Sequence, residues 1–186
     1  AQAFITTDLD DNQITAFHPG AMSFSHQNHI ADVDQVSLGI VAPDGRDGMI
    51  QHAKEFSEAG IPFVFDPGQG LPMFNREELL YFVTLADYAA MNEYEAKMLE
   101  EKTGQALSEI AANLKALIVT RGGAGSMIYA NGKILDIPLV AAKEIVEILN
   151  GKIQFSAAAE YYSDSAFLTK LTSDKLLCIK NNLVLF

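Results

Sequence analysis

Polar and apolar residues alternate in two short stretches at the start of the chain, residues 2–7 and 13–18. Alternation with a period of two, in segments rich in β-forming residues, is typical of strands. The acidic segment "DLDDN" between them is typical of a turn, and Pro19 and Gly20 do not continue a strand ladder easily. The sequence therefore predicts a small N-terminal β-hairpin.

Beyond the hairpin, short apolar segments alternate with segments whose apolar residues have helical spacing. The apolar segments predict buried strands at 36–41, 61–65 and 115–120. The amphipathic segments predict helices at 48–60, 75–86, 92–104 and 105–114. A further strand pair is expected around Asn131-Gly132, because this dipeptide is a strong hairpin signal. The alternation predicts an α/β fold with a mostly parallel sheet.

Three loops that contain glycine follow the expected strands: "APDGRDG" at 42–48, "DPGQG" at 66–70 and "TRGGAG" at 120–125. Ligands of open α/β sheets bind outside the carboxyl ends of the strands. These loops are therefore the candidate positions of a binding or catalytic site.

Composition narrows the class of function. The 186 residues include 13 Lys and Arg against 24 Asp and Glu, a net charge of −11, which argues against a protein that tracks nucleic-acid phosphates. No apolar run approaches the roughly 20 residues that span a bilayer, and the first residues have no basic segment typical of a signal peptide. These features predict a cytoplasmic enzyme with no membrane partner.

Histidine and cysteine give little indication of a metal site. Cys178 is the only cysteine, which excludes an intrachain disulfide, and we expect it to be a buried apolar residue. His26 and His29 are three residues apart but have no companion cysteines, so surface polarity is the favoured interpretation.

The segment "TRGGAG" has two interpretations. Its glycines let a backbone approach a ligand closely, and free N–H groups attract phosphate. It is not a P-loop, since no Lys-Ser/Thr follows, and a strand rather than a helix is expected after it. A tight turn between two strands explains the same residues.

The segments around Asp66 and around Asn92 and Glu95 also have two interpretations each. Asp66 stands at the end of an expected strand, where an acid suits a ligand or metal, but Asp-Pro-Gly also forms turns. Asn92 and Glu95 begin an expected helix. They fit either a capping box or part of a site for a metal and a phosphate.

In this order and spacing the segments resemble the ribokinase-like family, the PfkB carbohydrate and nucleoside kinases. The resemblance covers about residues 1–140 and looks most like bacterial adenosine kinase-like members. It is carried by the hairpin ending in "HPGAM", by "IPFVFDPGQG", by "NEYEA" as the Asn-x-x-Glu motif, and by "VTRGGAGSMIYANGK". It implies a ribokinase-like three-layer α/β fold, incomplete at both ends, with the small N-terminal β-hairpin.

The resemblance also implies an activity and a site. The activity is ATP- and Mg²⁺-dependent phosphotransfer to a hydroxyl of a sugar or nucleoside. Glu95 would hold the metal, and Asn92 would help to organise the metal and phosphate. The cofactor-binding turn would comprise Thr120, Arg121, Gly122, Gly123 and Gly125. In the family the hairpin region often packs against a second subunit, which implies a homodimer.

The chain departs from the family pattern after about residue 140. The expected Gly-x-Gly-Asp motif, which carries the catalytic base, is not found; Asp164 in "SDSAF" lacks the glycines and is not assigned as that base. Charge changes at the same place: residues 1–140 carry 8 basic and 19 acidic residues, and residues 141–186 carry 5 of each. We expect a partial kinase domain at 1–140 and a divergent C-terminal segment at 141–186 that packs on it. The alternative function is a non-catalytic nucleotide-binding or interaction module derived from such a kinase.

Overall fold

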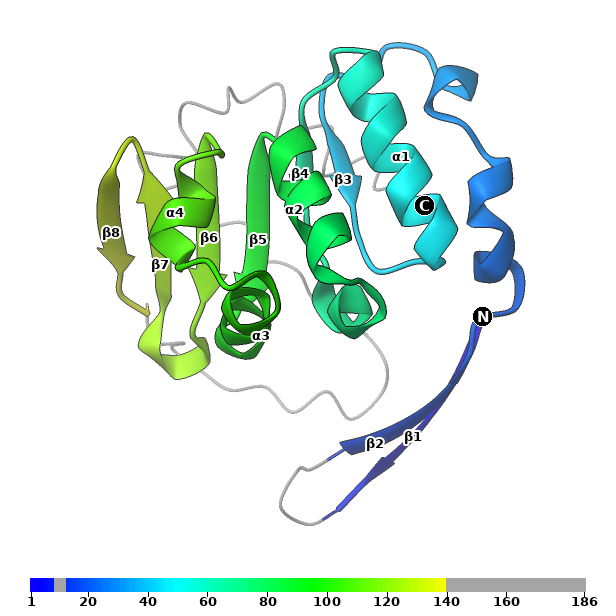
Figure 1. Ribbon diagram of the computed structural model, residues 1–186. Helices are drawn as coiled ribbons and strands as arrows, with labels where there is room; N and C mark the ends of the chain where they lie inside the picture. The colour runs from blue at the N-terminus through cyan, green and yellow to red at the C-terminus, as the bar shows by residue number, and fades with distance from the viewer. Residues whose placement is uncertain (9–12, 140–186) are drawn as a thin grey trace. The chain divides into compact units, whose positions relative to one another are not determined.

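The computed structural model describes residues 1–8 and 13–139, and within them the chain forms a six-stranded sheet and a separate two-stranded one (Figure 1). The strand order of the larger sheet is β3-β4-β5-β6-β7-β8. Its strands are β3 (Gly39–Val41), β4 (Phe63–Phe65), β5 (Tyr88–Asn92), β6 (Ala116–Thr120), β7 (Ser126–Ala130) and β8 (Lys133–Ile137). The first four are parallel, and β7 and β8 run antiparallel to their neighbours. The predicted parallel α/β sheet is confirmed, with an antiparallel hairpin at one edge.

The hairpin between β7 and β8 has the predicted turn. Asn131 and Gly132 have φ angles of 52° and 70°. Positive φ at both central residues is the geometry of a type I′ turn, whose twist matches that of the flanking strands. A local sequence signal therefore sets the register of the sheet edge.

Four helices connect the strands: α1 (Arg46–Glu58), α2 (Arg76–Leu85), α3 (Glu93–Thr103) and α4 (Leu107–Ala111). Asn75 and Asn92 cap α2 and α3, and Gly104 ends α3 in the left-handed conformation that glycine favours. The expected helix at 105–114 is shorter in the structure, because Asn113 and Leu114 bond three residues back rather than four.

Four 3₁₀ segments of the described chain have no helical counterpart in the sequence prediction: Gly20–Gln27, which is kinked at Phe24, Ile30–Asp32, Gly68–Met73 and Gly122–Ala124. Short 3₁₀ turns depend on local packing more than on periodicity. The expected strand at 36–41 is likewise reduced to Gly39–Val41, where it pairs with β4.

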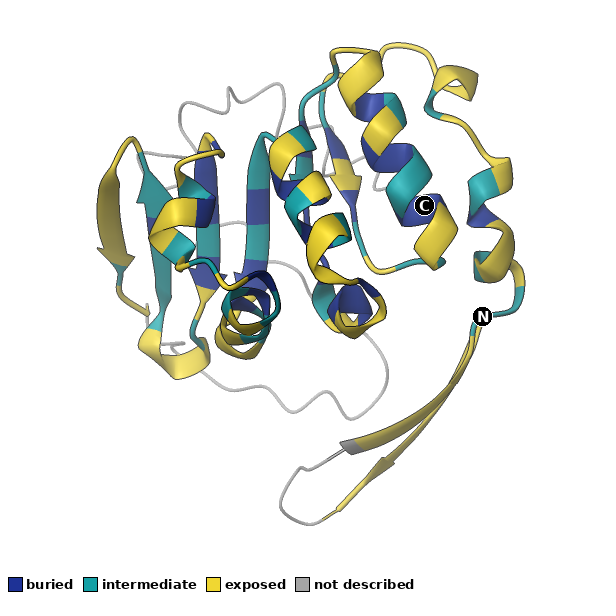
Figure 2. Cartoon of the chain, in the orientation of Figure 1, coloured by how far each residue is buried: buried dark blue, intermediate teal, exposed yellow. Residues whose placement is uncertain are grey.

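The hydrophobic core lies between one face of the sheet and the helices, and α1, α2 and α4 are drawn over that face in Figure 1. Alternate residues of the parallel strands supply it, among them Val41, Phe65, Met91 and Val119. Figure 2 shows the buried positions on the inner sides of the strands and helices. On the opposite face the edge residue Ile40 is 48% exposed.

The N-terminal hairpin consists of β1 (Gln2–Thr7) and β2 (Gln13–His18), paired antiparallel as predicted. Its large apolar side chains are exposed: Phe4, Ile5, Ile14 and Phe17. Exposed apolar residues on a two-stranded sheet mark a surface that gains stability when another surface covers it.

Residues 141–186, with Asp164 and Cys178, lie outside the described residues, and so does the predicted packing of that segment. In the described part of the chain no helix is long and apolar enough to cross a membrane.

Candidate functional site

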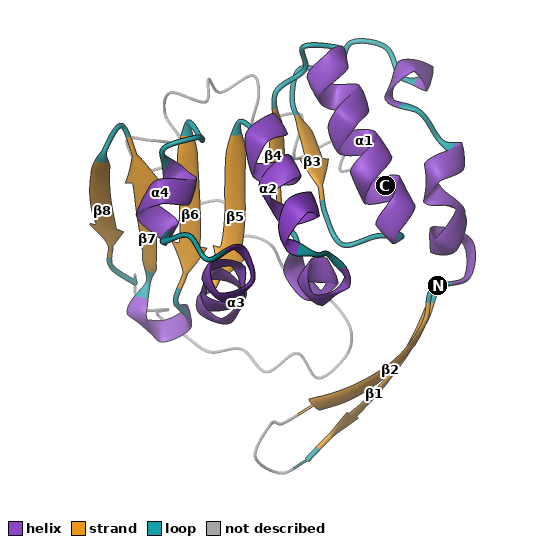
Figure 3. Ribbon diagram, viewed as in Figure 1, coloured by secondary structure: helices purple, strands orange, loops and turns teal. Residues whose placement is uncertain are grey.

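The three loops that the sequence marked as candidates meet one edge of the sheet. Strands β3, β4, β5 and β6 are parallel neighbours, so their carboxyl ends at Val41, Phe65, Asn92 and Thr120 lie at the same edge (Figure 3). Asn92 and Thr120 are register partners, and the Thr120 hydroxyl donates a hydrogen bond to the Met91 carbonyl at 3.4 Å. Sheet topology therefore brings together residues that are far apart in the sequence.

Asn92 and Glu95 form a capping box at the start of α3. The Asn92 Oδ1 atom accepts a hydrogen bond from the Glu95 N–H at 2.9 Å, and the Asn92 N–H donates to Glu95 Oε2 at 2.8 Å. The capping interpretation is thus confirmed. It leaves Glu95 Oε1 without an ion-pair partner among the described residues.

A second Asn-x-x-Glu box begins α2. The Glu78 N–H donates to Asn75 Oδ1 at 2.9 Å, and the Asn75 N–H donates to Glu78 Oε2 at 3.0 Å. Glu78 also pairs with Arg46 of α1. The same four-residue spacing therefore produces the same cap twice, and only the charged surroundings of the two glutamates differ.

Asp66, which directly follows β4, lies close enough to Glu95 to sense its charge. Burial raises the pKa of the Asp66 carboxyl, the negative charge of Glu95 raises it further, and a hydrogen bond from the Gly68 N–H opposes the rise. A bound cation would stabilise the ionised form of a carboxylate such as Asp66, which burial and a neighbouring negative charge disfavour. The sequence left two interpretations of Asp66 open, a ligand or metal position and a turn residue. It could not place Asp66 near Glu95, because that proximity depends on the order of the strands.

Gly68 fixes the shape of the loop that carries Asp66. Its φ angle is +44°, and a Cβ atom at this position would lie 2.5 Å from Pro43 Cγ. The loop after β3 therefore packs directly against the loop after β4. A glycine is required there both for the backbone conformation and for the contact.

The segment Arg121–Gly125 forms the tight turn between β6 and β7. The Arg121 N–H donates to the Gly125 carbonyl at 2.8 Å, and the Gly125 N–H donates to the Gly122 carbonyl at 3.0 Å. Within the described residues the N–H groups of Gly122 and Gly123 donate to no other backbone oxygen, and a Cβ on either glycine would meet nothing within 4 Å. The turn interpretation is confirmed, and it leaves two accessible donors of the type that phosphates accept.

The Arg121 side chain is held within the same hairpin. Its guanidinium pairs with Asp136 of β8 and donates to the Ala124 carbonyl at 3.0 Å. Asp136 therefore balances the charge of Arg121, and the bonds of Arg121 to Asp136 and Ala124 stabilise the turn. Its predicted role in binding a nucleotide stays a prediction, as do those of Thr120 and the glycines.

Metal ligands are sparse at this edge. No group of three or more His, Cys, Asp or Glu side chains that could hold a metal occurs in the described part of the chain. Mg²⁺ commonly binds through one or two carboxylates, with waters and substrate phosphates completing the octahedron. The donor set of Asp66 and Glu95 fits that mode of binding and does not fit an all-protein cage.

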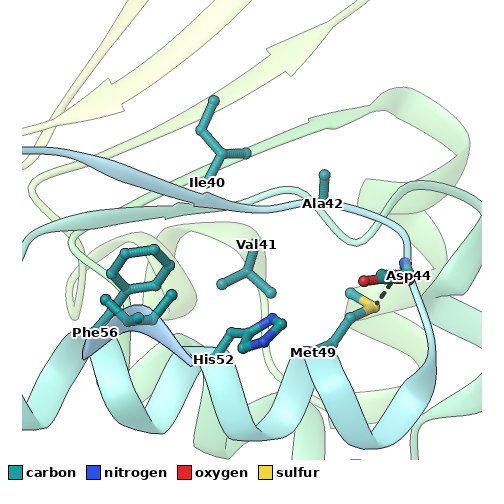
Figure 4. Close-up of a pocket in the computed structure, with 8 residues that line it drawn as sticks. Ile40, Val41, Ala42, Asp44, Met49, His52 and Phe56 are labelled. Carbon is teal, nitrogen blue, oxygen red and sulfur yellow. Dashed lines mark hydrogen bonds between the residues drawn. The ribbon is translucent and has the colours of Figure 1, made fainter. Parts of the chain in front are cut away.

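A small cavity between β3 and α1 is a poor candidate for the substrate site. It measures about 20 Å³, and its lining includes Val41, Met49, His52 and Phe56 (Figure 4). The Asp44 N–H points to the Met49 sulfur at 3.4 Å beside it. This volume accommodates about one water molecule, so a nucleoside or sugar does not fit.

The chain is similar to known carbohydrate and nucleoside kinases over most of its length. The model of the pfkB family carbohydrate kinases matches residues 1–148, slightly beyond the expected end at 140. The structure of Burkholderia thailandensis nucleoside kinase in complex with inosine is 51% identical, with a TM-score of 0.74. The match covers 78% of this chain and 48% of that one.

Two further proteins extend the comparison. Methanocaldococcus jannaschii nucleoside kinase is 29% identical over 146 residues, and its structure gives a TM-score of 0.70. The match covers 78% of this chain and 48% of the relative. An Escherichia coli ribokinase-fold protein, solved with ATP and Mg²⁺, is 17% identical, with a TM-score of 0.58. The match covers 77% of this chain and 51% of that one, and it supports the fold alone.

The chain spans about half the length of the curated relatives it matches. The predicted ribokinase-like α/β fold and the predicted family resemblance are both confirmed. The chain belongs to the pfkB family of carbohydrate kinases.

Proposed function

We propose that this chain carries the nucleotide-binding part of an ATP-dependent nucleoside kinase. The observation that supports this most directly is the meeting of Asp66, Glu95 and the Gly122–Gly123 turn at one sheet edge. The Burkholderia relative, which is 51% identical, was solved with inosine and with ADP and inosine, which favours a nucleoside over a simple sugar as the phosphate acceptor. A cytoplasmic location, where ATP is abundant, is part of this proposal.

In this proposal the chain's residues mainly position charge. Glu95 and Asp66 would hold Mg²⁺, which neutralises charge on the phosphates when bound. Asn92 keeps the Glu95 backbone and side chain in place through the capping box. Thr120 and the free N–H groups of Gly122 and Gly123 would face the phosphates, with Arg121 and Gly125 shaping the turn. The γ-phosphoryl group passes to the acceptor hydroxyl, ADP leaves, and the hydroxyl proton goes to a base that lies outside this set.

We expect the purified chain to bind ATP in the presence of Mg²⁺, with a dissociation constant at or below about 1 mM, the upper range for enzyme substrates. Isothermal titration calorimetry with and without excess EDTA measures this. Formation of ADP with a nucleoside panel headed by inosine then tests turnover. Binding without turnover would reduce the chain to a nucleotide-binding module, and no binding at about 10 mM ATP would overturn the proposal.

We also propose that the hairpin of β1 and β2 mediates a homodimer. Phe4, Ile5, Ile14 and Phe17 are 53–79% exposed, and covering such residues stabilises an interface. We expect sedimentation equilibrium to give twice the chain mass for the native protein. The double substitution Ile14→Ser and Phe17→Ser should give the monomer mass, and a native monomer at high concentration contradicts the proposal.

A further inference from the structure

The segment Asn28–Asp32, here called the strap, runs beside α1. It follows the 3₁₀ helix Gly20–Gln27, and residues 33–38 lead from it to the strand β3. The buried His52 of α1 bonds through Nε2 to the Asn28 carbonyl at 3.0 Å. Ile30 packs against the hydrophobic core. The strap is therefore one fastening of the N-terminal elements to α1, beside the direct packing of the preceding 3₁₀ helix, whose Ser25 lies against Gly48 of α1.

One carboxylate holds two successive residues of the strap. Glu55 Oε1 lies 2.7 Å from His29 Nδ1, and Glu55 Oε2 accepts a hydrogen bond from the Ile30 N–H at 2.8 Å. Gln51, one turn earlier on α1, donates to Glu55 Oε1 at 2.9 Å and so orients the carboxylate. Any change in the charge of His29 therefore acts on the same group that holds the Ile30 backbone.

The charged groups around His29 come from two elements. Glu55 faces it from α1, and Asp32, on its own 3₁₀ helix, accepts a hydrogen bond from the His29 N–H at 3.0 Å. Glu58, further along α1, pairs with Lys54 at 3.6 Å and lines the same groove as His29 and Glu55. Acidic groups thus dominate the surroundings of the imidazole, which favours its protonated form.

We propose that the strap is a pH-sensitive fastening, in which protonated His29 and ionised Glu55 hold residues 28–32 against α1 and loss of the His29 proton loosens them. Its working range lies within the physiological interval, because histidine is the side chain that ordinarily titrates there. The loosened state releases the Ile30 backbone while the sheet stays folded, since the bonds that weaken are those of Glu55 to His29 and to the Ile30 N–H.

The direction of the effect follows from the two groups. The hydrogen bond to Glu55, then its charge, raises the pKa of His29 above 6.5. His29 therefore stabilises the strap fully below that value, and this stabilisation is lost as the pH rises through the raised pKa. Burial alone would raise the pKa of Glu55, but hydrogen bonds from His29, Ile30 and Gln51 lower it below 4.5. The contribution of Glu55 is present above 4.5 and is lost as the pH falls through the lowered pKa.

Hydrogen exchange of the Ile30 amide tests the proposal on the whole chain. After correction for intrinsic exchange, we expect its protection to fall about two- to fivefold between about pH 5.5 and about pH 8.5, the range that exposed ion pairs produce. His29→Gln keeps a hydrogen-bond donor but cannot titrate. In this variant the protection of the Ile30 amide should therefore be independent of pH. An NMR titration of the His29 ring should also give an ordinary pKa in Glu55→Gln.

A matched control is His18→Gln, which removes an exposed histidine from the hairpin and should keep the native pH dependence. Since His29 is exposed, its substitution should not unfold the chain. Two results would overturn the proposal that His29 controls the strap. One is a native protein whose Ile30 amide protection does not fall with rising pH, and the other is a His29→Gln variant in which it still falls.

Discussion

Replacement of Glu95 by glutamine is expected to weaken ATP binding in the presence of Mg²⁺ by about tenfold or more, the usual cost of damaging a metal's ligand shell. Glutamine at the third helical position still completes a capping box, so α3 should begin as before. The substitution removes the charge beside Asp66 that would attract the cation. Calorimetry at saturating Mg²⁺ measures the affinity, and thermal unfolding checks the fold.

The second capping box provides a matched control. Glu78→Gln makes the same change at the same helical position of α2, and it removes an ion pair with Arg46. We expect it to cost at most about 1 kcal/mol of stability and to leave ATP binding unchanged. If both variants bind ATP equally well, Glu95 serves only as a cap, and the proposed metal site is wrong.

These two boxes show where prediction from the sequence ends. The Asn-x-x-Glu spacing is local, so the residues of each box are sufficient to form its cap. What separates Glu95 from Glu78 is their neighbours, Asp66 and Arg46 respectively, which come from other elements. That difference depends on strand order and helix packing, which no local pattern contains.

The fold follows the same division. Period-two alternation and the Asn131-Gly132 turn predict both hairpins, because turn and strand geometry are set by adjacent residues. The 3₁₀ helix Gly68–Met73 was expected as a loop. Its first residue, Gly68, packs against Pro43, a residue of another loop. The strap was missed for the same reason, since Glu55 reaches it across 25 residues of sequence.

Substitution of Phe82 by alanine is expected to have the largest effect on stability, a loss of about 3–5 kcal/mol in the free energy of unfolding. Phe82 of α2 is fully buried, stacks on Phe65 with ring centroids 4.5 Å apart, and meets the edge of Phe74 at 4.9 Å. Its removal would leave a cavity between α2 and β4 that the rigid aromatic neighbours cannot fill. Urea denaturation measures the loss.

The neighbouring residue separates this packing effect from any change in helix propensity. Tyr81→Ala makes a comparable truncation one position earlier on α2, where the side chain is 40% exposed, and should cost less than about 1 kcal/mol. Equal losses for the two variants would show that α2 does not pack through Phe82 as the structure has it.

Phe65 immediately precedes Asp66, so a loosened ring stack should also displace the carboxylate that lies beside Glu95. We therefore expect Phe82→Leu, which keeps most of the volume, to fold stably and still weaken ATP binding in the presence of Mg²⁺, while Tyr81→Ala leaves it unchanged.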